Sequence, residues 1–106
     1  MNLWAEISDM EGRCLKTLDR GFKFDMVKVT PSSIIVRPHR TNKERLIPRV
    51  EIEGAWKELV AWGHISRTQI EARHAPRNPV YVAAILSELP GVRYTIKPIV
   101  VYYTKS

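Results

Sequence analysis

The chain has 106 residues, 44% of them hydrophobic, and no apolar run long enough to span a membrane, so we expect one domain over residues 1–106 and no membrane association. One cysteine, Cys14, excludes an internal disulfide, argues against a cysteine-based zinc site and, with no recognisable signal peptide, favours a cytoplasmic protein. The formal net charge of +6 is typical of nucleic-acid binders, although ordinary basic proteins share it.

The first half of the chain predicts a short helix followed by an antiparallel meander. Apolar residues recur at helical spacing at Leu3, Trp4, Ile7 and Met10. Residues 22–30 alternate apolar and polar side chains, residues 34–36 are β-branched, and residues 45–48 form a third short strand. Because polar turns separate these segments, we expect a meander of three strands.

The clearest helix is predicted over residues 51–62. Its apolar residues are spaced as a stripe that faces a core: Ile52, Ala55, Trp56, Leu59 and Val60. Glu51 and Glu53 suit the positive end of the helix dipole. Since Trp56 lies in the middle of the stripe, we expect its side chain to be largely buried.

Two short helices with separate start signals follow. Gly63 suits the end of the preceding helix, and Ser66 with Gln69 has the Ser-x-x-Gln spacing of a capping box. Asn78 is expected to cap the second helix, with Pro79 in its first position. Two short helices joined by a few residues, with a third helix before them, predict a helix-turn-helix.

The last part of the chain predicts β structure. Pro90-Gly91 should stop the last helix, and residues 92–96 and 99–103 are strands by residue type. Lys97-Pro98 between them is either a hairpin turn or a bend in one strand. A hairpin directly after a helix-turn-helix is the wing of a winged helix. We therefore expect an α+β fold with an N-terminal helix, a small antiparallel β-meander, a winged-helix-like three-helix unit and a C-terminal β segment.

No group of residues predicts catalysis. The histidines lie in different segments without a second ligand type at metal spacing, and Cys14 has no neighbouring histidine in sequence. The acidic residues are not clustered as a nuclease requires, and there is no glycine-rich phosphate loop. We therefore expect no enzymatic activity, no catalytic residues, no metal site and no cofactor.

Two groups of residues are candidates for DNA contact. The first is a stretch of five cations with a single acid, Glu44, between them: Arg37, Arg40, Lys43, Arg45 and Arg49. The second combines base-edge contacts near the start of the last helix with phosphate contacts from the helix before it. Its members are Arg77, Asn78 and Tyr81, and Arg67, Thr68 and Arg73. Each group also has a purely structural interpretation. The basic stretch could be a solvated hairpin tip, Asn78 a helix cap and Tyr81 a half-buried aromatic residue.

A resemblance to small winged-helix modules that accompany prokaryotic restriction and helicase proteins is carried by TNKERLIPRVEIEGAW, GHISRTQIEARH and NPVYVAAILSELPGV. It covers about residues 17–103 and consists of a basic hairpin, an amphipathic helix and two capped helices. The resemblance implies DNA binding within a larger system. It brings no catalytic residue and names no target.

These observations predict a non-catalytic protein that binds DNA, in duplex form. The alternative is a protein-interaction adaptor, or a homodimer, that uses the helix-turn-helix face or adds its terminal strand to a partner's sheet. Salt distinguishes the two, because binding through several phosphates weakens steeply as the salt concentration rises.

Overall fold

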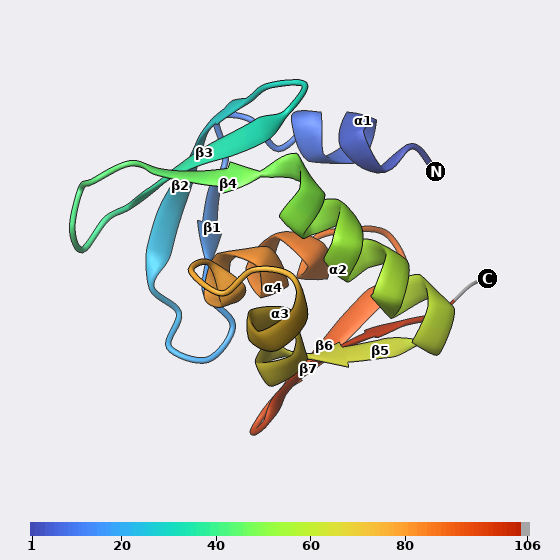
Figure 1. Cartoon of the computed structure of the whole chain (residues 1–106). Helices are drawn as coiled ribbons and strands as arrows, with labels where there is room; N and C mark the ends of the chain where they lie inside the picture. The colour runs from blue at the N-terminus through green and yellow to red at the C-terminus, as the bar shows by residue number, and fades with distance from the viewer. Residues whose placement is uncertain (105–106) are drawn as a thin grey trace.

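The computed structural model describes residues 1–104, which form two antiparallel sheets with helices packed between them (Figure 1). Helix α1 (Leu3–Ser8) precedes the first sheet. The four strands of that sheet pair in chain order: β1 (Cys14–Lys16), β2 (Lys23–Val29), β3 (Ser33–Pro38) and β4 (Arg45–Pro48). The meander thus has one strand more than predicted, because the three residues of β1 are too few to show an alternating pattern.

The second half of the chain begins at α2 (Arg49–Trp62). The elements that follow are β5 (His64–Ser66), α3 (Arg67–Arg73), α4 (Pro79–Ser87), β6 (Val92–Ile96) and β7 (Ile99–Tyr103). Strands β5, β7 and β6 form the second sheet in that spatial order. None of the helices within residues 1–104 is both long and apolar enough to cross a membrane.

Two of the predicted helix boundaries are confirmed. Gly63 ends α2 in the left-handed conformation, with φ of 82°, which a residue with a side chain rarely adopts. The capping box is present: Ser66 Oγ accepts from the backbone N–H of Gln69 at 3.1 Å, and Gln69 Oε1 accepts from that of Ser66 at 2.9 Å. Local hydrogen bonds therefore fix the start of α3.

The predicted cap of α4 is wrong, although Pro79 does occupy its first turn. The side chain of Asn78 makes no capping hydrogen bond. It is only 5% exposed, and its Nδ2 donates to Glu51 Oε1 of α2 at 3.4 Å. The hydrogen bond to Glu51 takes the place of the predicted capping hydrogen bond. A buried side-chain amide requires a hydrogen-bond partner, and in this structure packing supplies the one from α2.

Lys97-Pro98 is a hairpin turn, since Ile96 and Ile99 are paired on either side of it. The peptide bond between Lys97 and Pro98 is cis. Strand β7 lies between β5 and β6, so both of its edges are already hydrogen-bonded. The expectation that the terminal strand could add to a partner's sheet is therefore wrong.

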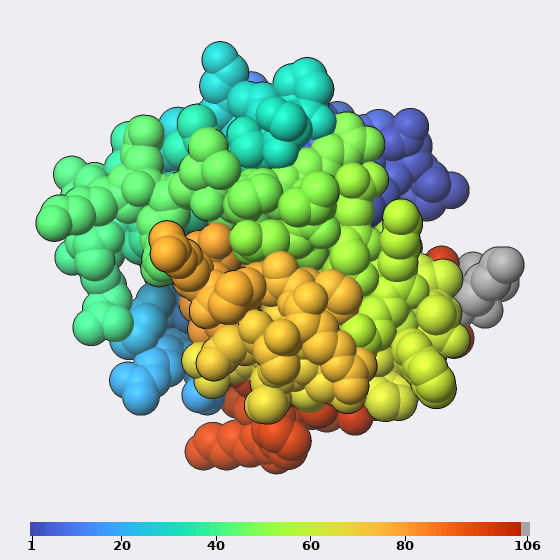
Figure 2. All heavy atoms as spheres, viewed as in Figure 1, coloured from blue at the N-terminus to red at the C-terminus, as the bar shows by residue number. Residues whose placement is uncertain are grey.

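Helix α4 lies at the centre of the core. Six of its nine residues are buried, which makes it apolar around most of its circumference: Pro79, Val82, Ala83, Ala84, Ile85 and Leu86. It packs against α2 and α3, against β1 of the first sheet, and against β6 and β7 of the second. Figure 2 shows α2 and α3 covering the middle of the face beneath which Figure 1 places α4.

The apolar stripe of α2 is narrower than predicted. Ile52, Ala55 and Leu59 are fully buried, whereas Trp56 is only partly buried against the edge of the Tyr103 ring and Val60 is 43% exposed. At about 100° per residue, Val60 points roughly 100° away from the centre of the stripe and Trp56 lies at its flank. The prediction that Trp56 is largely buried is confirmed in part: its side chain packs against the core but is not among the fully buried residues, because periodicity alone placed the stripe too far toward its side.

Gly54, in the middle of α2, makes room for a histidine. A Cβ added at this position would lie 2.7 Å from Nδ1 of His74. The other ring nitrogen of His74 is 2.9 Å from Oε1 of Glu58, whose side chain is only 12% exposed and whose Oε2 also accepts from Arg73 at 2.7 Å. The close approach of His74, the residue after α3, to α2 therefore depends on the absence of a side chain at Gly54.

In an ordinary helix interior, Gly→Ala stabilises by about 1 kcal/mol. We expect Gly54→Ala to destabilise instead, because the His74 ring would have to leave Glu58. In a His74→Ala background the same substitution should recover the normal stabilisation. Equilibrium denaturation of all four proteins in this double-mutant cycle is the measurement. Equal effects of Gly54→Ala in the two backgrounds would contradict the proposed contact.

Candidate nucleic-acid interface

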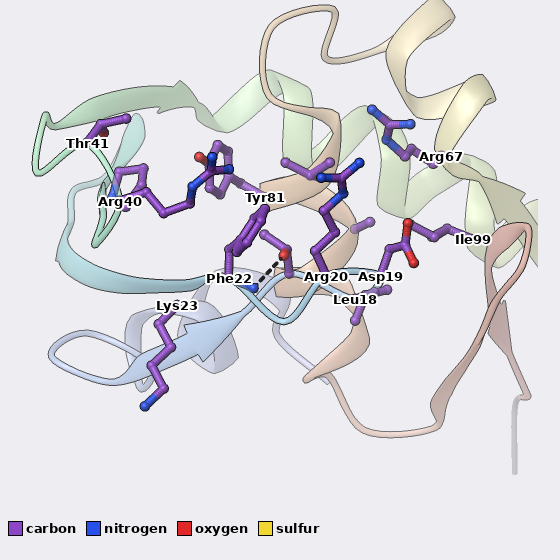
Figure 3. A pocket seen from close by; sticks show the side chains of 14 residues that line it. Leu18, Asp19, Arg20, Phe22, Lys23, Arg40, Thr41, Arg67, Tyr81 and Ile99 are labelled. Atoms are coloured by element: carbon purple, nitrogen blue, oxygen red, sulfur yellow. Dashed lines mark hydrogen bonds between the residues drawn. The ribbon is translucent and has the colours of Figure 1, made fainter.

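A cavity of about 440 Å³ opens where connections of the first sheet approach the amino ends of α3 and α4 (Figure 3). Its walls come from the β1–β2 connection, the β3–β4 connection, the first residue of α3, the first turns of α4 and the start of β7. Segments from both halves of the chain are needed to form it, so the cavity depends on how the meander packs on the helices.

Four cations and a single acid, Asp19, line the cavity. The cations are Arg20, Lys23, Arg40 and Arg67. In Figure 3 the ammonium group of Lys23 extends away from the other three cations. In the described part of the chain, none of the four has a carboxylate within 4 Å, whereas several arginines elsewhere do. The positive charge at the cavity is therefore not neutralised by ion pairs in the structure.

Aromatic rings form part of the same wall. The guanidinium carbon of Arg40 lies 4.1 Å from the centroid of the Phe22 ring. The ring of Tyr81 meets Phe24 edge to face, with centroids 5.1 Å apart, and this contact anchors it to the core. Planar apolar surfaces thus stand beside cationic groups, a combination on which single-stranded bases can stack, whereas the phosphates of a duplex would meet only the cations.

The predicted basic stretch does not form one surface. Arg40 alone of its five cations lines the cavity, and the side chain of Lys43 lies in the exposed β3–β4 loop. Arg45 donates to the carbonyl oxygen of Arg77 at 2.9 Å and lies 5.4 Å from the centroid of the Tyr81 ring. These contacts tie β4 to the segment that precedes α4.

Arg49 is held in place by three groups. It donates to the Pro31 carbonyl oxygen at 2.9 Å, lies 3.3 Å from a carboxylate oxygen of Glu53 and stacks over the Trp4 ring at 4.6 Å. These contacts join α1 and the β2–β3 turn to the start of α2. Arg49 therefore has a structural role, and the sequence-based expectation of a phosphate contact is not favoured by its position.

Arg37 points away from the cavity, on the outer face of the meander. It lies 3.6 Å from Oδ2 of Asp25 and 3.8 Å from a carboxylate oxygen of Glu44. The hydrogen bond with His39 and the positive charge of Arg37 hold the pKa of Asp25 below its ordinary value. Arg37 is therefore engaged with acids rather than presented to a ligand.

The second predicted group is also divided. Arg67 and Tyr81 line the cavity, and Thr68 and Arg77 are exposed beside them in sequence. Asn78 is buried, as described above, and Arg73 is paired with Glu58 at 2.7 Å. The predicted residues that the fold brings together at the cavity are Arg67, Tyr81 and, from the basic stretch, Arg40.

Sequence reasoning misses two of the cavity cations. The sequence pattern places Arg20 in a turn and Lys23 on the wet face of a strand, and neither position suggests a site. The β1–β2 connection that carries Arg20 reaches α4 only because β1 pairs with β2, and that short strand is not predicted. The clustering of basic residues at 16–23 around Phe22 is the one signal in the sequence that could have found them.

Comparison with known proteins adds no assignment. No protein-family model, no curated protein and no solved structure matches the chain. The resemblance to winged-helix modules of restriction and helicase systems therefore stays a prediction. Any function must be argued from the geometry of the site.

The structural role of Arg45 can be tested against a neighbour in the same region. We expect Arg45→Met, which keeps the apolar stem, to lower the free energy of unfolding by about 1 kcal/mol, because it removes the hydrogen bond to Arg77 and the cation from the Tyr81 ring. Lys43→Met removes the same charge from the exposed loop and should change stability little. Denaturant titrations that give equal values for the two variants would contradict a structural role for Arg45.

Proposed function

We propose that the protein binds duplex DNA without catalysing a reaction, and that its C-terminal half is a winged helix. In support of the fold, β5 lies between α2 and α3 in sequence, and the β6–β7 hairpin follows α4 directly. The spatial order β5-β7-β6 is that of a winged helix, in which the hairpin is the wing. The helix-turn-helix of this unit consists of α3 and α4.

The observation that carries the proposal is the unpaired positive charge at the cavity. Three arginines without carboxylate partners in residues 1–104, Arg20, Arg40 and Arg67, line a concave surface of about 440 Å³ that contains a single acid, Asp19. Gathering like charges is unfavourable unless an anion is present, and DNA phosphates supply several at once. Guanidinium groups are well suited to them, because a planar fork can hold two phosphate oxygens.

The position of α4 argues for backbone contact over base readout. A recognition helix that enters the major groove must present an exposed polar face. Helix α4 is instead enclosed, and Asn78 at its start is buried against Glu51. We therefore place the DNA against Arg20, Arg40 and Arg67, with little dependence on base sequence.

One observation favours the rival function, a protein-interaction adaptor. Strand β6 pairs only with β7 within the described residues, so its other edge is free, and it carries Tyr94 and Ile96, which are 47% and 42% exposed. An extended peptide could pair with such an edge through its backbone. This mode depends on hydrogen bonds and apolar contact, so its affinity should depend only weakly on salt.

The cavity cations can be tested together. We expect the triple variant Arg20→Ala, Arg40→Ala, Arg67→Ala to bind duplex DNA more weakly for every sequence. The dependence of log K on log salt should flatten by about 0.9 for each phosphate that the variant no longer neutralises. Fluorescence-anisotropy titrations at several salt concentrations give both quantities.

A matched control separates local contact from net charge. The triple variant Arg13→Ala, Lys28→Ala, Lys57→Ala also removes three positive charges, but none of these residues lines the cavity. It should weaken binding much less. Equal reductions in affinity for the two triple variants would mean that the cavity does not hold phosphates, and parent binding that is insensitive to salt would favour the adaptor.

A further inference from the structure

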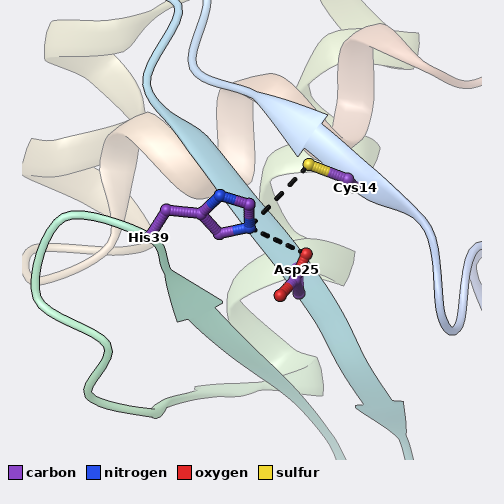
Figure 4. Close-up of side chains that lie close together, drawn as sticks. All are labelled: Cys14, Asp25 and His39. Carbon is purple, nitrogen blue, oxygen red and sulfur yellow. Dashed lines mark hydrogen bonds and ion pairs between the residues drawn. The ribbon is translucent and has the colours of Figure 1, made fainter.

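The outer face of the meander brings together three side chains that are far apart in sequence. Cys14 on β1 lies directly opposite Asp25 on β2, and His39 follows the end of β3 (Figure 4). The buried neighbours of Asp25 along β2, Phe24 and Met26, face the core, so the alternation of the strand points Asp25 outward. The three side chains converge above the sheet and are at least partly exposed.

The three potential ligand atoms are close to one another. Nε2 of His39 lies 3.0 Å from Oδ1 of Asp25 and 4.0 Å from Sγ of Cys14, and all three atoms lie within 4.8 Å. We propose that Cys14, Asp25 and His39 bind a divalent transition-metal ion of the zinc type, with solvent in the remaining position. This site is independent of the DNA-binding proposal.

Two of the three ligand-to-ligand distances are close to those around a tetrahedral ion, and the third, from Sγ of Cys14 to Oδ1 of Asp25, is no more than 4.8 Å. With zinc bonds of about 2.3 Å to sulfur and 2.0–2.1 Å to nitrogen and oxygen, tetrahedral edges are about 3.5 Å between S and N and about 3.4 Å between N and O. The observed separations of 4.0 and 3.0 Å depart from these values by about 0.5 Å, which small side-chain rotations can supply. A thiolate, an imidazole and a carboxylate are all ligands that Zn²⁺ accepts.

The same geometry argues against a catalytic Cys–His–Asp relay. In such a relay the nucleophile contacts one ring nitrogen of the histidine and the carboxylate contacts the other. Here Sγ of Cys14 and Oδ1 of Asp25 both approach Nε2 of His39. A shared metal ion requires that all three groups converge on one point. A proton relay requires instead that the thiol and the carboxylate contact different nitrogens of the ring.

Neighbouring charges support the ligand set. Arg37 contacts Oδ2 of Asp25 at 3.6 Å, which leaves Oδ1 directed toward His39 and fixes the carboxylate. The charge of Arg37 is in turn compensated by Glu44 at 3.8 Å. A thiolate and a carboxylate would together balance a divalent ion. The sequence-based expectation of no metal site considers only ligands close together in sequence, whereas these three are joined by strand pairing.

The experiment titrates the reduced full-length chain with Co²⁺, which substitutes for Zn²⁺ and is coloured. We expect one Co²⁺ per chain, with the sulfur-to-cobalt charge-transfer band and the visible bands of a tetrahedral site, and displacement of the cobalt by Zn²⁺. Cys14→Ser should abolish the charge-transfer band. Asp25→Asn and His39→Gln should weaken binding by at least about tenfold.

His64→Gln is the matched control, because His64 is exposed and lies outside the cluster. It should bind Co²⁺ like the parent. All four substitutions are at positions outside the core, and circular dichroism with thermal melting verifies that each variant is folded. A parent protein without the charge-transfer band would overturn the proposal. So would unchanged affinity in Asp25→Asn or His39→Gln, since the site would then lack the corresponding ligand.

Discussion

The enclosure of α4 between two sheets is the constraint on which the rest of the structure depends. Val82, Ile85 and Leu86 are fully buried, and burying each such side chain contributes about 1.5–3 kcal/mol. Because partners of α4 come from β1 as well as from β6 and β7, neither sheet can move without exposing this apolar surface. The same packing brings connections of the meander over the amino ends of α3 and α4, and the cavity exists only as a consequence of that placement.

This packing limits how the proposed helix-turn-helix of α3 and α4 could contact DNA. A free three-helix unit could present its last helix to a groove, but the meander contacts that helix directly, through Tyr81 on Phe24 and through Arg45 on Tyr81. What is left at the surface is the rim of the cavity, where Arg40 and Arg67 come from opposite halves of the chain. A DNA-binding surface of this kind would be divided between the two sheets, so neither half could form it alone.

Sequence reasoning succeeds where local physics decides and fails where distant contacts do. The Ser66–Gln69 box and the left-handed Gly63 depend on residues within one turn, so their signals can be read directly. Asn78 has the right residue type for a cap but is drawn to Glu51, twenty-seven positions away. The short strands β1 and β5 carry too few residues for a periodic signal, and both are defined by their partners. Arg20 is not predicted as a candidate for the same reason. The pairing of β1 with β2 brings the connection that carries Arg20 to the cavity, and this pairing has no signal in the sequence.

The period of two along β2 explains how one strand can serve two separate sites. Phe24 faces inward, where it supports Tyr81 at the cavity wall, and Asp25, the next residue, faces outward to His39 and Cys14. A sheet places residues from neighbouring strands within reach of one another irrespective of their separation in sequence. Ligand spacing within one segment is therefore a poor guide for such a chain: the register Cys14↔Asp25 is a property of the pairing of β1 with β2. A slip of one residue in that pairing would turn Cys14 to the opposite face and separate the three side chains.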